Sequence, residues 1–388
     1  MIEKFSQKRI YMDYAATTPI LPYVADAVIK YMYNEFGNPS SLHYFGIKAR
    51  EIIENTRNTI SNFLNVEPEN IIFTSGGTES DNLAIQGIIL ANYPKKQHII
   101  TSQIEHSAVY NTCLFLKKFG HEVSFVSVNE DGLIDLNKLE KEIKPNTSLI
   151  SVHYANNEIG TIQPIKEIGE IAQNYNIAFH TDAVQAFCKI KINIKDEKIM
   201  LLSGSGHKIY ALKGAGFLYI KNKSIIQPII HGGPHEFELR AGTENVLSIA
   251  SIGKAIEFLS DKIEDEERRL RKLSDKLINS IFNEIDGVHL NGSLNSKYRL
   301  PNIINLRFDN VNGYDLMLAL DREGIACSTG SACHSSSMEP SRVLLALGLS
   351  INEVLSSIRI SIGYFTKEED IEYLIKVLKK VVNELRKW

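Results

Sequence analysis

Short apolar runs alternate with amphipathic stretches over the first two thirds of the chain. Six runs have the composition of buried strands, at 71–74, 98–101, 123–126, 148–152, 177–180 and 216–220. Between them, stretches such as 81–90 and 165–175 repeat apolar residues at the period of a helix. Buried strands that alternate with amphipathic helices predict a mostly parallel sheet covered by helices on both faces. The pattern therefore predicts an α/β fold.

The last third of the chain carries longer helical patterns. Apolar residues recur on one face from about 262 to 285, and we expect this helix to connect the large α/β unit to a smaller one. A second long pattern ends the chain and has Ile371, Leu374, Leu378, Val381, Val382 and Leu385 on one face. A chain of 388 residues also exceeds one typical core, which favours one large and one small domain.

Composition and charge exclude several classes of protein. Hydrophobic residues make up 44% and charged residues 23%, as in ordinary globular proteins, and a net charge of −3 gives no reason to expect nucleic acid or a membrane as a direct partner. No apolar run approaches the roughly 20 residues that span a bilayer, and we expect no signal peptide. The four cysteines form neither a disulfide framework nor a CxxC zinc motif. We therefore expect a cytoplasmic protein with no metal site.

The segment 203–208, Ser-Gly-Ser-Gly-His-Lys, ends in a lysine after a small, polar turn. Such a lysine can face a pocket and form a Schiff base with an aldehyde. Upstream, Asp182 ends an apolar strand, where its carboxylate can hold a pyridine nitrogen protonated; the alternative role is a helix cap. Pyridoxal phosphate (PLP) requires both groups, because its ring withdraws electrons only when that nitrogen is cationic. Lys208 and Asp182 together predict a PLP enzyme that acts on an amino acid.

A candidate phosphate site lies at 74–79, Thr-Ser-Gly-Gly-Thr-Glu, between a strand and a helix pattern. Glycines let the backbone approach an anion, and the following helix offers free N–H groups, with Thr78 adding a hydroxyl after Gly77. On its own such a turn is more often a plain helix entry. Ser205 and His207, next to Lys208, supply further donors to the same phosphate.

Three other polar residues follow strands. His106 starts a helical pattern and can stack on the cofactor ring or move protons; the alternative is a histidine that packs at a helix start. Asn157 stands in Asn-Asn-Glu-Ile-Gly, where its amide can reach the ring oxygen; the alternative is a plain turn. Gln185, three residues after Asp182, indicates that this short segment lines the pocket.

The segment 327–337 has almost no bulky apolar side chain and carries Cys333. A loop of small residues with a thiol suits a nucleophile that moves between a pocket and an acceptor; the alternative is a surface loop with an incidental cysteine. Cys327 follows an apolar strand end and is expected to pack there. Cys113 and Cys188 lie in apolar settings and are expected to be inert core residues.

Arg359 alternates with apolar neighbours in Ser-Ile-Arg-Ile-Ser-Ile. A guanidinium that points inward from a strand needs an anionic partner. A substrate α-carboxylate fits it bidentately, and a salt bridge within the protein is an equal alternative.

These motifs lie in the order found in one family. They are Tyr-Met-Asp-Tyr-Ala-Ala-Thr-Thr-Pro from residue 11, Gly-Asn-Pro-Ser-Ser from 37, Gly-Thr-Glu-Ser-Asp-Asn from 77, Asn-Asn-Glu-Ile-Gly from 156, Gly-His-Lys-Ile-Tyr from 206, Arg-Ala-Gly-Thr-Glu-Asn from 240, Gly-Ser-Ala-Cys from 330, Glu-Pro-Ser from 339, and Arg359. The chain resembles, nearly end to end, the NifS/IscS-type cysteine desulfurases of the class V branch of PLP-dependent aminotransferase-like proteins.

The resemblance implies a PLP-dependent transferase of fold type I, with a mostly parallel seven-stranded sheet in a large domain and a smaller α+β domain. Residues 1–20 would pack with the small domain, 21–258 would form the large PLP-binding domain, and 259–388 would form the small domain that carries the active-site cysteine.

The resemblance also implies roles for individual residues. Lys208 would bind PLP covalently and move the substrate proton, and Cys333 would be the nucleophile. His106 would stack on the ring and help to deprotonate the incoming thiol. The remaining implied contacts are Asp182 to the ring nitrogen, Asn157 and Gln185 near the ring oxygen, Gly77, Thr78, Ser205 and His207 to the phosphate, Thr243 from the partner subunit of a homodimer, and Arg359 with Asn38 to the substrate carboxylate.

The implied reaction converts L-cysteine to L-alanine and leaves a persulfide on Cys333. An iron–sulfur scaffold or a tRNA-thiolation enzyme would accept the sulfur. The alternatives are a selenocysteine lyase, a class V aminotransferase and a non-catalytic sulfur carrier. The chain departs from many relatives at Ala211-Leu212 and at His334, and neither change removes a reactive group.

Overall fold

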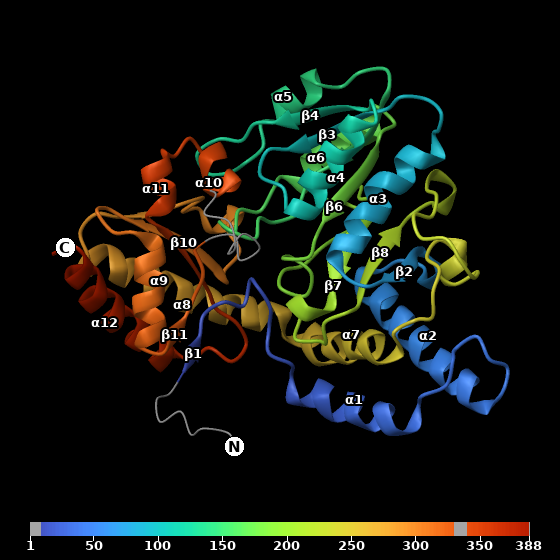
Figure 1. The fold of residues 1–388 in the computed structure, drawn as a ribbon, viewed down its shortest axis with the longest axis horizontal. Helices are drawn as coiled ribbons and strands as arrows, with labels where there is room; N and C mark the ends of the chain where they lie inside the picture. Colours follow the sequence, from blue (N-terminus) through green and yellow to red (C-terminus); the bar gives the residue numbers. More distant parts are fainter. Residues whose placement is uncertain (1–8, 330–339, 388) are drawn as a thin grey trace.

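The computed structural model describes residues 9–329 and 340–387. Its larger part contains a seven-stranded sheet in the order β2-β8-β7-β6-β5-β3-β4 (Figure 1). The strands are β2 (Ile71–Thr74), β3 (His98–Ser102), β4 (Glu122–Val126), β5 (Thr147–Ser151), β6 (Ala178–Asp182), β7 (Leu201–Ser205) and β8 (Gly216–Ile220). β8 pairs antiparallel with both of its neighbours and the other pairs are parallel. The carboxyl ends of β3, β5, β6 and β7 therefore meet at one edge of the sheet.

Helices cover both faces of this sheet. They are α1 (Pro22–Asn34), α2 (Tyr44–Leu64), α3 (Gly77–Ala91), α4 (Ser107–Lys118), α5 (Leu136–Lys141), α6 (Ile165–Asn174) and α7 (Val246–Leu259). Successive strand residues point to opposite faces: Leu149 packs in the core under α3 and α4, and Ile150 packs in the core on the side of α2, α6 and α7. Because both faces are buried, the strands are continuous apolar runs rather than alternating ones.

The smaller part has its own hydrophobic core around an antiparallel sheet of β9 (Val288–Leu290), β10 (Ile303–Phe308) and β12 (Ser357–Ser361). Its helices are α8 (Ile263–Glu284), α9 (Gly313–Arg322), α10 (Arg342–Ala346), α11 (Ile351–Leu355) and α12 (Glu368–Leu385). Figure 1 shows this part beside the carboxyl edge of the large sheet. The cavity described below is lined from both parts.

The N-terminal segment runs between the two parts. β1 (Ile10–Tyr11) pairs in parallel with β11 (Ile325–Ala326). Met12 packs in the core of the smaller part, whereas Tyr14 and Ala15 pack in the core of the larger one. The chain thus crosses from one core to the other within three residues, at Asp13. The expected domain boundaries at residues 20 and 258 stay a prediction.

The predicted α/β class and mostly parallel seven-stranded sheet are confirmed. Each of the six predicted strands is present. The ends of β2 and β8 are as predicted and those of the other four are shifted by one or two residues, and the helices expected at 262–285 and at the chain end are α8 and α12. Strand β7 was not among the predicted strands. The small polar turn expected directly before Lys208 is the short 3-10 helix Gly206–Lys208. Ser203 and Gly204 lack the bulk of typical strand residues, but buried neighbours on both sides of β7 enclose them. In the described ranges, no helix is long and apolar enough to cross a bilayer.

A buried ion pair fixes the segment that leads to Thr243. Glu236, Phe237 and Glu238 have φ angles of 45°, 57° and 66°, in the left-handed region that costs about 1 kcal/mol or more per non-glycine residue. The Glu236 carboxylate accepts hydrogen bonds from Arg57 Nη1 (2.9 Å) and Nη2 (2.7 Å) and from the backbone N–H of Phe73 (2.7 Å). These contacts hold the strained segment against the edge strand β2.

We expect Glu236→Gln to lower the free energy of unfolding by about 3–5 kcal/mol, because it leaves the Arg57 charge buried without its main partner. Urea unfolding of the apo-protein measures this. Glu54→Gln is the matched control: Glu54 pairs with the same Arg57, but its side chain is 49% exposed, so its loss should cost less than about 1 kcal/mol. Equal effects of the two substitutions would contradict this account.

Candidate active site

A cavity of about 480 Å³ lies at the carboxyl edge of the large sheet. Ligand sites in open α/β sheets form at this edge, because loops leave the strands there and helices begin there. Residues that follow β3, β5, β6 and β7 line it, together with the start of α3. Ala15 and Ala16 of the N-terminal segment, and Pro340–Arg342 and Arg359 of the smaller part, complete the lining. The cavity therefore depends on both parts of the molecule.

Lys208 ends a short 3-10 helix, Gly206–Lys208, directly after β7. Its Nζ donates hydrogen bonds to the backbone carbonyls of Ala15 (2.6 Å) and Ala16 (2.7 Å). His207 Nδ1 lies 3.1 Å from Thr17 Oγ1. The N-terminal segment thus covers the lysine and fixes where its amine lies in the cavity.

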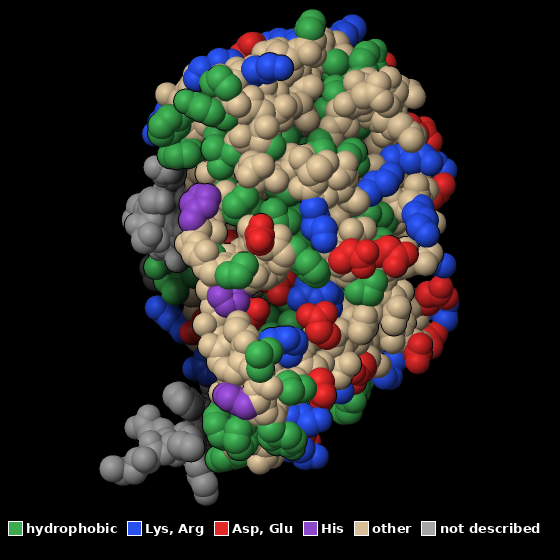
Figure 2. Space-filling model, turned by 90° about the vertical axis from the view of Figure 1, so that its right-hand side faces the viewer, with side chains coloured by type: hydrophobic (Ala, Val, Ile, Leu, Met, Phe, Trp, Pro, Cys, Tyr) green, Lys and Arg blue, Asp and Glu red, His purple; other side chains and the backbone are tan. Residues whose placement is uncertain are grey.

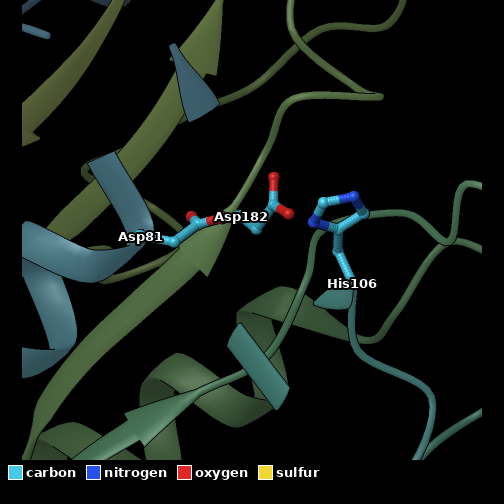
Figure 3. A group of neighbouring side chains, drawn as sticks. All are labelled: Asp81, His106 and Asp182. Atoms are coloured by element: carbon cyan, nitrogen blue, oxygen red, sulfur yellow. The ribbon is translucent and has the colours of Figure 1, made fainter. Parts of the chain in front are cut away.

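Asp182, the last residue of β6, lies between Asp81 on α3 and His106 at the start of α4 (Figure 3). One carboxylate oxygen of each aspartate and one ring nitrogen of His106 lie within 4.8 Å of one another. Asp182 Oδ1 accepts the backbone N–H of Val184 (2.9 Å) in a turn. No helix begins there in the described residues, so Asp182 is not the helix cap weighed as its alternative. The second carboxylate oxygen of Asp182 remains for a ligand.

Burial decides how protons are shared in this group. Burial and the nearby Asp182 carboxylate raise the pKa of Asp81 well above its usual value. Burial also raises the pKa of Asp182, and His106 opposes that shift. Two adjacent anions are therefore disfavoured, and the groups that lower the pKa of Asp182, His106 and the backbone N–H of Val184, favour the negative charge on Asp182. Burial lowers the pKa of His106, whose Nδ1 accepts the backbone N–H of Ala108 (3.1 Å), so the neutral ring carries its proton on Nε2.

The start of α3 and the end of β7 form an anion cradle. Gly77 and Thr78 open α3, where the first backbone N–H groups have no acceptor within the helix. A Cβ atom on Gly77 would lie 2.7 Å from Val184 Cγ2, so only glycine fits here. Ser205 Oγ is buried and has no hydrogen-bond partner among the described residues. A phosphate bound here would accept hydrogen bonds from the first backbone N–H groups of α3 and from the Ser205 hydroxyl.

Gln185 and Asn157 both line the cavity. Gln185 Nε2 donates to the Ala15 carbonyl (3.0 Å), and its Oε1 accepts from Lys189 Nζ (3.2 Å). The backbone carbonyl of Asn157 accepts from Arg359 Nη1 (2.9 Å). The Gln185 amide is therefore held by neighbours on both sides. Asn157 lies in a turn, as the alternative for it expected, and that turn also lines the cavity.

Arg359 lies on β12 and is almost completely buried, and its Nη2 donates to Asp13 Oδ1 (2.8 Å). The salt bridge weighed as an alternative for Arg359 is thus present. The guanidinium nevertheless lines the cavity, and its Nε has no hydrogen-bond partner in the ranges described. Asp13 had not been singled out from the sequence, because it contacts Arg359 across 346 positions.

The structure does not bring every expected site residue together. Asn38 and Thr243 are exposed and do not line the cavity of this chain. Cys333 lies outside the described residues. Cys113 and Cys188 are buried as expected, and burial raises the pKa of both thiols. Asp81, Glu105 and His153 also line the cavity but were not predicted as site residues. The sequence pointed to them only by position: Asp81 lies in the motif that starts at residue 77, Glu105 directly precedes His106, and His153 lies just before the motif that starts at residue 156.

Comparisons with known proteins agree with this geometry. A family model described as "Aminotransferase class-V" matches residues 10–374. The chain belongs to the aminotransferase class-V family. A relative from Dictyoglomus turgidum, called "Cysteine desulfurase IscS", is 46% identical over 98% of this chain and 96% of its own length. The predicted family is therefore confirmed.

Two solved structures share the fold. One, a "NIFS-LIKE PROTEIN", has a TM-score of 0.90 and 33% identity and covers 97% of this chain and 100% of its own. The other, "SspA in complex with cysteine", has a TM-score of 0.81 and 38% identity and covers 91% of this chain and 98% of its own. PLP is the cofactor of this class V family. Its requirements fit the cavity, which offers a lysine, a buried carboxylate and an anion cradle with an unpartnered hydroxyl.

We expect Ser205→Ala to weaken PLP binding about 10- to 100-fold, because a hydrogen bond to a charged phosphate contributes about 1.5–3 kcal/mol. Titration of the apo-protein, followed by cofactor absorbance, measures the dissociation constant. The apo-protein itself should be no less stable, since Ser205 Oγ has no partner to lose. Thr181→Val is the matched control: its hydroxyl is also buried and unpartnered in the described part of the chain, but Thr181 does not line the cavity. A similar loss in both variants would exclude a direct phosphate contact.

Proposed function

We propose that this protein is a PLP-dependent cysteine desulfurase that converts L-cysteine to L-alanine and transfers the sulfur to Cys333. The observation that carries the proposal is the convergence of Lys208, Asp182 and Arg359 on one cavity. These groups would bind the two ends of a cofactor-bound amino acid. The similarity to proteins named cysteine desulfurase over nearly the whole chain supports this choice of substrate.

Each residue of the cavity would have a distinct task. Asp182 would accept the N–H of the pyridine ring, His106 would pack against the ring face, and Gly77, Thr78, Ser205 and His207 would hold the phosphate. When bound, PLP stabilises negative charge on the substrate Cα atom. Lys208 would anchor the cofactor and then move the proton of the substrate Cα, for which its amine must leave the carbonyls of Ala15 and Ala16.

The sulfur step balances without an external oxidant. The Cys333 thiolate would attack the substrate sulfur, so that an S–S bond forms while the substrate Cβ–S bond breaks. The electron pair of that bond stays on the carbon skeleton, which takes up protons and leaves as L-alanine. Only the thiolate is reactive. His106 is the proposed group that takes the thiol proton of the substrate, for which its Nδ1 must first release the backbone N–H of Ala108.

The proposed homodimer accounts for the position of Thr243. Arg240, three residues earlier, pairs with Glu79 of α3 through Nε–Oε1 (2.9 Å) and Nη2–Oε2 (3.4 Å). This contact fixes the exposed segment, and Thr243 would then reach the phosphate of the partner subunit. Exposed apolar side chains on and after α1, including Tyr33, Phe36, Leu42 and Tyr44, offer a surface for such a partner. Figure 2 shows apolar side chains gathered at its lower end, at the height where Figure 1 draws α1.

The sulfur acceptor would be a protein of iron–sulfur cluster assembly or of tRNA thiolation, in the cytoplasm. A persulfide is transferred by attack of an acceptor thiol, so the acceptor must present a cysteine near Cys333. The similarity to relatives named cysteine desulfurase IscS supports the role in iron–sulfur assembly. The cavity does not distinguish between the two acceptors, because both would take sulfur from the same persulfide on Cys333.

We expect Cys333→Ala to abolish alanine and sulfide formation from L-cysteine in the presence of dithiothreitol, by at least about 100-fold, because no other group replaces the nucleophile. Mass spectrometry of the wild-type protein without reductant should find one added sulfur atom on Cys333. Cys327→Ala is the matched control and should keep its activity, since burial raises the pKa of Cys327 to about 12 and leaves it a thiol.

Other outcomes separate the alternatives. Alanine formation from selenocysteine that survives Cys333→Ala, with none from cysteine, would identify a selenocysteine lyase. A stable pyridoxamine form after addition of an amino donor would identify an aminotransferase. A protein that binds no PLP would be a non-catalytic carrier.

We expect Arg359→Lys to raise KM for L-cysteine about 10-fold or more while kcat changes less, because lysine keeps the charge but loses the bidentate fork. Steady-state kinetics measure this. Arg299→Lys is the matched control: Arg299 is also a buried arginine with an unpartnered Nε among the described residues, but it lies outside the cavity lining. An unchanged KM in Arg359→Lys would reject the substrate-carboxylate role.

A further inference from the structure

A second lysine lies close to the cavity and has no part in the proposed reaction. Lys189 lies in the turns that follow β6. Its Nζ donates hydrogen bonds to the backbone carbonyl of Gln185 (2.9 Å) and to the side-chain Oε1 of the same residue (3.2 Å). Burial, and then the charge of Lys208, lower the pKa of Lys189 to about 7. A buried amine is unfavourable for folding, so the position of Lys189 calls for an explanation.

The contacts of Gln185 determine which way round its amide lies. A side-chain amide has an acceptor oxygen and a donor nitrogen, which exchange places when the group makes a half-turn. Lys189 Nζ supplies a donor to Oε1 on one side, and the Ala15 carbonyl accepts from Nε2 (3.0 Å) on the other. After a half-turn, the NH₂ group would face the amine and the amide oxygen would face the Ala15 carbonyl oxygen. The half-turn would therefore break both hydrogen bonds.

These contacts connect Lys189 to the centre of the cavity. The Ala15 carbonyl that accepts from Gln185 also accepts from Lys208 Nζ (2.6 Å). Gln185, Ala15 and Lys208 all line the cavity, whereas Lys189 does not. Lys189 can therefore act on a bound group in two ways: through the orientation of the Gln185 amide, or through its charge, which acts on Lys208.

The orientation of the amide matters because Nε2 carries two N–H donors. The Ala15 carbonyl accepts one of them. Gln185 is 5% exposed and lines the cavity, so an oxygen acceptor on a bound group can take the second. PLP has such an oxygen on the ring carbon beside the one that bears the aldehyde. With the amide turned round, Oε1 would face that oxygen and repel it.

We propose that Lys189 is a positioning residue: by donating to Gln185 Oε1, it orients the amide so that Nε2 donates to the ring oxygen of PLP. The contact to PLP rests on the proposed function. Lys189 itself does not touch the cofactor.

The first experiment compares two ligands. Apo-protein, as wild type and as Lys189→Met, is titrated with PLP and with 3-deoxypyridoxal 5′-phosphate, an analogue that lacks the ring oxygen, and binding is followed by absorbance. Methionine is unbranched and offers no N–H donor. We expect Lys189→Met to bind PLP about 10-fold more weakly, because the hydrogen bond to the ring oxygen is weakened or lost, and to bind the analogue as the wild type does. Equal weakening for both ligands would overturn the proposal and assign Lys189 a charge effect on Lys208 or a packing role.

The second experiment asks whether Lys189 acts through Gln185. Gln185→Met should weaken PLP binding by at least the factor seen in Lys189→Met. The double variant should bind PLP no more weakly than Gln185→Met alone, because Lys189 then has no amide to orient. Losses that add up in the double variant would contradict a role through Gln185.

Lys262→Met is the matched control. Lys262 Nζ also donates to the backbone carbonyl four residues before it, that of Phe258 (2.6 Å), but neither residue lines the cavity. This variant should bind PLP and the analogue as the wild type does, and a loss equal to that of Lys189→Met would count against the proposal. Lys189→Leu, a second apolar variant, should repeat the result of Lys189→Met.

Desulfurase activity separates this inference from the proposed function. A wild-type protein that binds PLP but forms no alanine from L-cysteine would refute the proposed function, while the affinities would still decide the role of Lys189. If alanine is formed and Lys189→Met binds PLP as tightly as the wild type, the proposed function stands and the positioning role is rejected.

Discussion

A carboxylate that must stay charged in a buried place is the constraint on which this site depends. Burial favours the neutral form of Asp182, yet only its anion can hold the proton of a pyridine nitrogen. The neighbours meet this requirement in different ways. The raised pKa of Asp81 disfavours a second anion beside Asp182, and the backbone N–H of Val184 stabilises the charge of Asp182. His180, whose pKa burial lowers to about 3, stays neutral under the site and adds no charge.

The fold brings these groups together because parallel strands end at a common edge. β3, β5, β6 and β7 each deliver polar side chains there, and α3 adds a helix start for an anion. The N-terminal segment then joins the two parts of the molecule. Asp13 holds Arg359 of the smaller sheet, and two residues later the carbonyls of Ala15 and Ala16 hold Lys208 of the larger one. The positions of Arg359 and Lys208 are therefore linked through the four residues 13–16.

Features that depend on neighbouring residues along the chain could be predicted from the sequence. Apolar runs of four or five residues located six strands, and the polar residue that ends a run, such as Asp182, marked the edge where the cavity lies. β7 was missed as a strand because Ser203, Gly204 and Ser205 are typical turn residues, and only their buried neighbours make them extended. The partners of the site were missed for another reason. Contacts such as Asp13–Arg359 and Glu105–His153 join distant positions, and a single sequence carries no signal for such pairs.

Arg359 shows how two interpretations of one residue can both hold. A guanidinium has five N–H donors. Asp13 takes one at Nη2 and the carbonyl of Asn157 takes one at Nη1, which fixes the plane of the group. Nε is buried without a partner among the described residues, on a side chain that lines the cavity. An orphaned buried donor is costly, and a carboxylate bound at Nε and a neighbouring N–H would remove that cost. The salt bridge to Asp13 thus orients the guanidinium for the proposed substrate contact and does not compete with it.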